Sequence, residues 1–142
     1  MRRIICFPVP TLCLVDGKCI AGGVFLSLAF DYRIGVDSEK TYFHLNELDN
    51  NLPLPAPLVN VLSARTGSNH LLRTFLASFG LQMSASEAAK HGLLQAAFSD
   101  RNEAMAHLLA LAKKLAPKGV NREIMTQIKT NVNAAALIPA KL

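Results

Sequence analysis

One stretch of this chain, residues 11–31, limits the possible folds more than any other. Residues 12–15 form an apolar run with a β-branched end, and the dipeptide Asp16-Gly17 that follows favours a tight turn. The sequence Ala-Gly-Gly at 21–23 then begins a second apolar run, which continues to Phe30 and is typical of a helix. The stretch therefore predicts a strand, a turn and a helix in succession.

The start of this predicted helix is the first candidate site. Two adjacent glycines, Gly22 and Gly23, allow another molecule to come close to the backbone. The first N–H groups of a helix have no acceptor within the helix, so they can donate to a negatively charged oxygen. We therefore expect function at the junction between the turn and the helix.

Composition narrows the class of protein. The 142 residues, 51% of them hydrophobic, are enough for one modest core. Apolar runs stay short of the ~20 residues that a membrane-spanning helix needs, because Asp16, Lys18 and Asp31 interrupt the longest candidate. The formal charge is +5, but the positive residues are scattered and Trp is absent, so we expect no nucleic-acid partner.

The three cysteines, Cys6, Cys13 and Cys19, lie close together in sequence among apolar residues. No Cys-x-x-Cys pair and no His at ligand spacing accompany them, so no metal site is expected. Three cysteines cannot complete a disulfide framework within one chain, and a reducing compartment fits this pattern best.

The remaining pattern predicts two more strands followed by helices. The strands are expected at 32–36 and 41–45, and the helices at 58–65, 68–79, 101–116 and 121–136, with a further helix that Ser84 or Ser86 caps and that stops at Gly92. In the last helix Ile124, Ile128 and Val132 are four residues apart and define an apolar face. Such a face can pack within one subunit or between subunits.

Several short motifs together resemble the crotonase superfamily, the enoyl-CoA hydratases and isomerases. They are Pro10-Thr11, Asp16-Gly17, the 21–23 glycine run, Asp31, Glu47 and the segment Ser-Ala-Ser-Glu-Ala-Ala-Lys-His-Gly-Leu-Leu at 84–94. The resemblance covers about residues 8–98. It implies an α/β fold in which residues 1–100 form the C-terminal part of a crotonase-like ββα spiral, and residues 101–142 form amphipathic helices that cover the site and build a trimer-like interface.

The resemblance also implies roles for individual residues. The backbone N–H of Gly22 corresponds to a donor that binds the thioester oxygen of an acyl-CoA, and Ala21, Gly23 and Phe25 lie around the substrate. Glu47 corresponds to the acid that moves a proton on the acyl chain. Apolar surroundings disfavour the charged form of a carboxylate and make it a stronger proton acceptor near neutrality.

Phe25 favours isomerisation over hydration. Hydratases of this family carry a second Glu at the position that Phe25 occupies, and a Phe cannot activate water. One carboxylate is enough to carry a proton between C2 and C4 of an enoyl chain, so the resemblance implies a Δ3,Δ2-enoyl-CoA isomerase of fatty-acid β-oxidation. Its substrate brings its own coenzyme A, and no other cofactor is expected. Asp49 is the alternative base.

Crotonase domains normally begin well upstream, with strands and a loop that donate the second oxyanion N–H. We therefore expect a truncated chain or a partner chain that supplies the other half, and impaired activity of residues 1–142 alone. Two alternatives to an active isomerase stay open: a non-catalytic crotonase-like subunit with an assembly role, and an enoyl-CoA hydratase with rearranged acids.

The last three residues, Ala140-Lys141-Leu142, resemble the peroxisomal address Ser-Lys-Leu, with Ala in place of Ser. Together with the acyl-CoA family resemblance, this tripeptide predicts a peroxisomal location, with mitochondria as the alternative.

Overall fold

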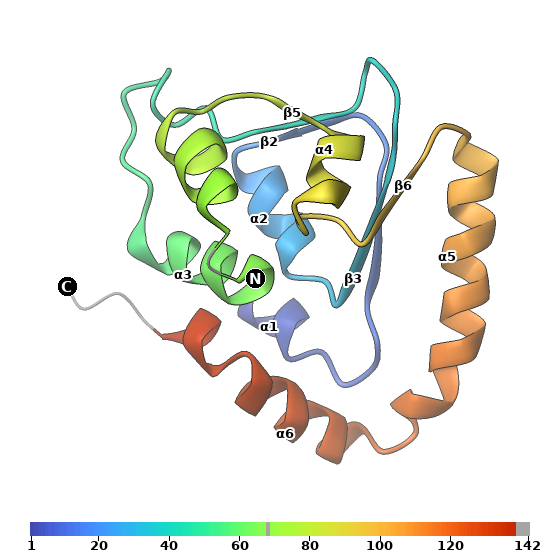
Figure 1. The fold of residues 1–142 in the computed structure, drawn as a ribbon. Coiled ribbons are helices and arrows are strands. Elements are labelled where there is room, and N and C mark those ends of the chain that lie inside the picture. The colour runs from blue at the N-terminus through green and yellow to red at the C-terminus, as the bar shows by residue number, and fades with distance from the viewer. Residues whose placement is uncertain (68, 139–142) are drawn as a thin grey trace.

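The strands of this protein form two small sheets around one central helix (Figure 1). The computed structural model describes residues 1–67 and 69–138. Its strands are β1 (Leu12–Val15), β2 (Lys18–Ile20), β3 (Tyr32–Val36), β4 (Tyr42–His44), β5 (Met83–Ser84) and β6 (Ala96–Phe98). Its helices are α1 (Arg2–Ile5), α2 (Gly22–Leu28), α3 (Ala56–Thr66), the π-helix η1 (Leu72–Ser78), α4 (Ala85–Lys90), α5 (Arg101–Leu115), α6 (Arg122–Val132) and the 3-10 helices η2 (Ala116–Gly119) and η3 (Ala134–Leu137).

Consecutive strands go to different sheets. One sheet has the order β1-β3-β6 and is parallel throughout, and the other has the order β2-β4-β5, with β2 and β4 parallel and β5 antiparallel to β4. Each turn of the chain therefore supplies one strand to each sheet and then a helix: β1, β2 and α2, followed by β3, β4 and α3. This ββα spiral confirms the predicted α/β fold class.

Strand β2 is one of the elements that the sequence did not predict, as are α1, β5 and β6. It has three residues, with Lys18 exposed, Cys19 buried and Ile20 half-buried, and it pairs with β4 more than 20 residues later in the chain. Three residues are too few for an alternating pattern to be recognised. Its pairing with β4 is a tertiary effect, and it determines where the following glycines lie.

Helix α2 fills the space between the sheets. Val24, Phe25 and Leu28 are fully buried and pack in one cluster with Phe43 of β4 and Leu62 of α3. Complete burial of side chains of this kind contributes about 1.5–3 kcal/mol each. The helix that carries the two glycines is therefore fixed by the core itself.

Arg33 lies inside the protein, on β3. Its Nε donates to Leu93 O at 2.8 Å and its Nη1 donates to Phe30 O at 2.9 Å. Burial, followed by repulsion from Arg65, lowers the pKa of Arg33 to about 10, so the guanidinium remains charged at neutral pH. It ties the central strand to the segment after α4.

Asp31 joins the C-terminal helix α6 to the body of the protein. Its Oδ2 accepts hydrogen bonds from Thr11 N and Oγ1, and it also accepts one from Lys129 Nζ at 2.5 Å. Lys129 donates to Val9 O as well, and the Arg65 guanidinium lies 3.8 Å from the other Asp31 oxygen. The Asp31 of the sequence signature therefore has a structural role, as the point where β1, α3 and α6 meet.

The predicted helices are largely confirmed, but the one expected at 121–136 is divided into α6 and the 3-10 helix η3. The second predicted helix contains the π-helix η1, and Asn69 Oδ1 accepts from the N–H groups of Leu71 and Leu72 at its start. The other half of its predicted cap, Ser68, lies outside the described residues. Of the two candidate caps for α4, Ser84 is the one that forms a capping box, with Glu87.

Helix α6 turns its apolar face outward. Ile124, Ile128 and Val132 are 47%, 52% and 76% exposed, while Lys129 on the opposite face is only 7% exposed. Of the two arrangements that the sequence left open for this face, packing within the same subunit is not found among the described residues. In Figure 1 α6 runs along the outside of the molecule, below α1. In the described part of the chain, no helix has the length and apolar character to cross a membrane.

Candidate active site at the ends of strands β2 and β4

Ala21, between β2 and α2, has an unusual backbone conformation. Its φ of 49° and ψ of −116° lie in a region that non-glycine residues rarely adopt. Strain of this kind costs roughly 1–3 kcal/mol and is kept only where the surroundings impose it. Here the Ala21 N–H donates to His44 O at 2.8 Å, and this bond extends the β2–β4 pairing by one residue. The strained turn directs the first residues of α2.

The first N–H groups of α2 are available to a ligand. Among residues 1–67 and 69–138, neither the Gly22 N–H nor the Gly23 N–H has a hydrogen-bond acceptor, and no side chain caps the helix. Gly22 is exposed, and a Cβ built on it would meet no atom within 4 Å. The backbone is therefore open to close approach at Gly22, as an oxyanion donor requires.

Glu47 has a buried carboxylate oxygen without a partner. It lies in the turn that follows β4, where Leu52 N–H donates to Glu47 O at 2.8 Å. Its Oε2 is buried and is the one buried side-chain polar atom in the described part of the chain that has no hydrogen-bond partner. Buried polar groups are normally paired, so an unpaired carboxylate oxygen indicates a functional role.

The sheet brings these two features to one edge. Strands β2 and β4 run parallel with Ile20 opposite His44. Gly22 follows Ile20 by two residues and Glu47 follows His44 by three, so both leave the sheet at the carboxyl ends of adjacent strands. A donor for a developing oxyanion and a candidate proton acceptor thus belong to the same side of the sheet.

Asp49, the alternative base, is differently placed. Its Oδ2 lies 3.2 Å from His44 Nε2, and its side chain is 59% exposed. A carboxylate that is solvated and paired with a histidine is a weaker candidate for proton transfer than one with a buried free oxygen. The sequence interpretation did not assign a role to His44, since a histidine in a short strand gives no signal of a partner five residues later.

Phe25, which was expected to lie around the substrate, is part of the hydrophobic core. Its side chain is 0% exposed and belongs to the hydrophobic core. The assignment of Phe25 to the surroundings of the substrate stays a prediction. The burial of Phe25 does not change the fact that position 25 carries no acid.

The cysteines are poorly suited to nucleophilic chemistry. Burial raises the pKa of Cys19 to about 11, and burial also raises the pKa of Cys13. Both thiols are therefore protonated at neutral pH and are weak nucleophiles. Within residues 1–67 and 69–138, no group of three or more His, Cys, Asp or Glu side chains is arranged to hold a metal ion.

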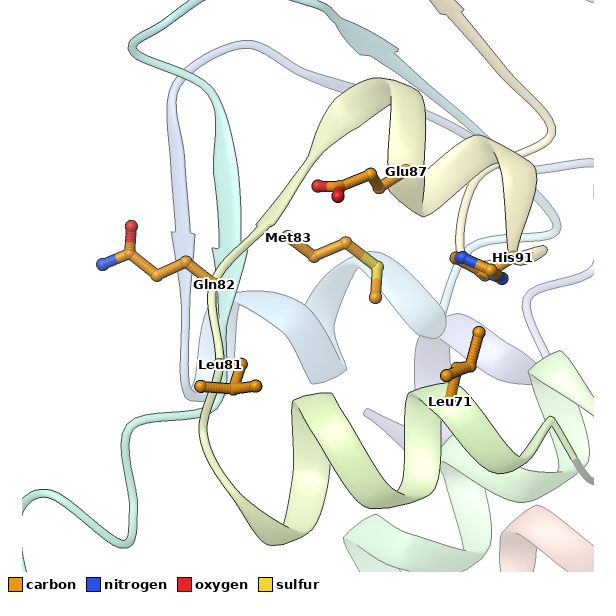
Figure 2. Close-up of a pocket in the computed structure, with 6 residues that line it drawn as sticks. All are labelled: Leu71, Leu81, Gln82, Met83, Glu87 and His91. Atoms are coloured by element: carbon orange, nitrogen blue, oxygen red, sulfur yellow. The ribbon is translucent and has the colours of Figure 1, made fainter.

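A separate cavity of about 280 Å³ lies between η1, β5 and α4. It is lined by Leu71, Leu81, Gln82, Met83, Glu87 and His91 (Figure 2). Glu87 already accepts hydrogen bonds from Ser84 N and Oγ, both at 2.8 Å, and these bonds lower the pKa of its carboxyl. The carboxylate of this cavity is thus occupied in capping α4.

Residues 1–141 match the family model described as enoyl-CoA hydratase/isomerase. Together with the spiral fold and the open Gly22 backbone, this match establishes that the chain belongs to the enoyl-CoA hydratase/isomerase family, which is the crotonase superfamily that the sequence motifs resemble. The family expectation is therefore confirmed.

Individual relatives agree with this assignment. The chain is 26% identical to enoyl-CoA delta isomerase 3 of Arabidopsis thaliana over 133 residues, which are 93% of this chain and 55% of that protein. It is 22% identical to the peroxisomal enoyl-CoA delta isomerase 1 of the same plant over 95% of this chain and 55% of the relative. The crystal structure of an enoyl-CoA hydratase/isomerase family protein from Pseudomonas syringae superimposes with a TM-score of 0.81, at 26% identity, over 96% of this chain and 56% of the other. The chain thus spans about half the length of these relatives.

Proposed function

We propose that this chain supplies the proton-transferring base and one oxyanion donor of a Δ3,Δ2-enoyl-CoA isomerase. The observation that carries the proposal is the unpaired, buried Oε2 of Glu47, which follows β4, together with the free Gly22 N–H that follows the adjacent parallel strand β2. The names of two relatives, both enoyl-CoA delta isomerases, support the same reaction class.

In the proposed reaction, Glu47 removes a proton from C2 of a 3-enoyl-CoA ester. The electron pair moves toward the thioester, whose oxygen gains negative charge and accepts the Gly22 N–H. The same carboxylic acid then returns the proton to C4, which leaves a 2-enoyl ester and an ionised Glu47. No atom is gained or lost, so one carboxylate suffices, and we propose no cofactor other than the coenzyme A of the substrate.

The proposed activity depends on a second donor. In the family resemblance that donor lies in a loop upstream of the segment that this chain matches, and the loss of one oxyanion donor typically lowers the rate by about 10²–10³. We therefore propose that residues 1–142 alone bind an acyl-CoA ester weakly and turn it over very slowly. A partner chain, or a longer form of the protein, would complete the site.

The experiment that tests this proposal uses Gly22→Ala. A Cβ at Gly22 meets no protein atom, so the variant should fold, and helix propensity favours Ala over Gly by up to ~1 kcal/mol. The methyl group would occupy the space that the thioester oxygen needs, so calorimetric titration with a 3-enoyl-CoA ester should show weaker binding than wild type. The matched control is Gly92→Asn at the end of α4, where a left-handed φ of 80° tolerates Asn. Equal binding by wild type and Gly22→Ala would contradict the proposed donor.

A second candidate function is a non-catalytic subunit with an assembly role. The outward apolar face of α6 favours it, because such a face is suited to contact another subunit. Binding of a 3-enoyl-CoA ester separates the two, since an assembly subunit needs none. Release of a 3-hydroxyacyl-CoA when trans-2-enoyl-CoA is supplied would instead indicate a hydratase.

We also propose a peroxisomal location. One relative is named as peroxisomal, and the tripeptide Ala140-Lys141-Leu142, which lies outside the described residues, resembles a peroxisomal address. Deletion of the three residues from a fluorescent fusion should move it from peroxisomes to the cytosol. Unchanged or mitochondrial fluorescence would contradict this location.

A further inference from the structure

We propose that His44 is a positioning residue that fixes both halves of the candidate site at once: its backbone carbonyl holds the Gly22 turn, and its imidazole holds the Glu47 turn through Asp49. This inference rests on the proposed function for its meaning in catalysis. The geometry itself stands independently of it.

The main chain of His44 holds the donor side. His44 lies opposite Ile20 in the parallel pair of β2 and β4, and its carbonyl oxygen accepts the Ala21 N–H at 2.8 Å. Ala21 is the strained residue with φ 49° that directly precedes Gly22. The bond to His44 therefore anchors the turn that directs the free N–H groups of α2.

The side chain of His44 holds the acid side. Its Nε2 lies 3.2 Å from Asp49 Oδ2, and its side chain is 14% exposed, so the ring is fixed in the body while Asp49 reaches it from the surface. An imidazole that carries a proton at Nε2 can pair with this carboxylate. The contact joins the two ends of segment 44–49, and Glu47 lies within this segment.

Glu47 has no other side-chain anchor. Within residues 1–67 and 69–138, no hydrogen bond or ion pair involves the Glu47 carboxylate, and its Oε2 is buried and unpaired. The direction of this carboxylate therefore depends on the backbone of its turn. That backbone is held by Leu52 N–H donating to Glu47 O, by Asn50 N–H donating to Asn46 O at 3.2 Å, and by the His44–Asp49 contact.

A third segment, at Gly80, passes close to the end of β4. Gly80 has a φ of 62°, and a Cβ built on it would lie 2.8 Å from Leu45 O and 3.8 Å from His44 Nε2. Only a glycine lets the chain pass this close to the end of β4. The chain at Gly80 thus passes close to the end of β4, from which His44 projects.

Amide hydrogen exchange of Leu52 and Asn50, measured by NMR on residues 1–142, tests the inference without substrate. His44→Leu and Asp49→Ala should each speed exchange at these amides by about two- to five-fold, the range expected for a partly exposed ion pair. The double variant should exchange no faster than either single variant, because both remove the same contact. His44→Gln keeps an N–H near the position of Nε2 and should restore most of the protection.

The controls separate this contact from a general loss of stability. His91→Leu replaces a histidine at the Figure 2 cavity and should leave both amides unchanged. If His44→Leu fails to fold, Asp49→Ala decides, since its side chain is 59% exposed. Unchanged exchange in Asp49→Ala, or no rescue by folded His44→Gln, would overturn the inference. Altered exchange in a protein that binds no 3-enoyl-CoA ester would keep the positioning role and reject the proposed function.

Discussion

Lys129 Nζ lies 2.5 Å from Asp31 Oδ2, and this contact joins residues 98 positions apart in the chain. It connects the buried side of α6 to Asp31, the last residue of the 11–31 stretch. Because the apolar face of α6 points away from the body, polar contacts hold this helix where hydrophobic packing usually would.

Lys129→Met should loosen α6. Asp31 would lose its nearest cation. Removal of one partner of a buried ion pair lowers stability by about 3–5 kcal/mol. The loss should be smaller here because the Asp31 side chain is 26% exposed. Urea unfolding followed by circular dichroism should show a loss of stability of about 2–3 kcal/mol. Lys113→Met, on the exposed face of α5, is the matched control and should change stability little. A wild-type midpoint for Lys129→Met would contradict this role.

Ala21→Gly should stabilise the protein. Glycine adopts φ 49° and ψ −116° without the steric clash of Ala, so the substitution relieves strain of roughly 1–3 kcal/mol. The greater flexibility of glycine in the unfolded chain offsets part of this gain. Thermal unfolding should therefore occur at a higher temperature. Ala89→Gly, in the last turn of helix α4, should have the opposite effect. A lower melting temperature for Ala21→Gly would show that this backbone is unstrained.

Stability should fall in acid through Glu87. Hydrogen bonds from Ser84 N and Oγ lower the pKa of this carboxyl, so its ionised form stabilises the folded state above the ordinary pKa of Glu, and this contribution is lost as the pH falls through the lowered value. Gln also completes a capping box but does not titrate. Melting temperatures between pH 7 and pH 3 should therefore fall further for wild type than for Glu87→Gln. Parallel curves would contradict the assignment.

Glu47→Gln tests the proposed base. In a form of the protein that converts 3-enoyl to 2-enoyl esters, the substitution should lower turnover by ~10²–10⁴-fold while the affinity for the ester stays nearly constant, because only proton transfer is removed. Asp49→Asn should retain far more activity, since that carboxylate is exposed. A larger loss in Asp49→Asn than in Glu47→Gln would exchange the two roles.

Residues 1–142 should self-associate. The exposed Ile124, Ile128 and Val132 form a continuous apolar face on α6, which water solvates poorly. Light scattering after size exclusion should give a mass above 15.4 kDa, and Ile128→Glu should shift it toward that value. A monodisperse wild-type monomer would contradict the proposed subunit contact.

Local sequence patterns were sufficient for the elements that depend on local interactions. The strand at Tyr32–Val36 contains the β-branched Ile34 and Val36 and could be predicted. The cap of α4 was predicted only as Ser84 or Ser86, and the capping box with Glu87 selects Ser84. The placement of Gly22 at a free helix start followed from the glycine pair alone. Family resemblance was needed to select Glu47.

Features that depend on distant parts of the chain were missed. β2 exists because β4 pairs with it, and the contact of His44 with Asp49 requires a turn that no pattern in the sequence defines. The spacing of Ile124 and Ile128 identified an apolar face on α6 but not the side to which it points. The contact between Lys129 and Asp31 determines which side of α6 faces the core. Hydrophobic periodicity gives no information about such a contact between charged residues.

Strands β1 and β2 each have a paired neighbour on one side only within the described chain, and they are consecutive while belonging to different sheets. A polypeptide that extended both sheets would have to offer two strands at the same time, joined by a short turn like that at Asp16-Gly17. Main-chain N–H and C=O groups on these edges do not distinguish one side chain from another. The protein would therefore select such a neighbour by the shape of its backbone, and many different sequences could satisfy the same two edges.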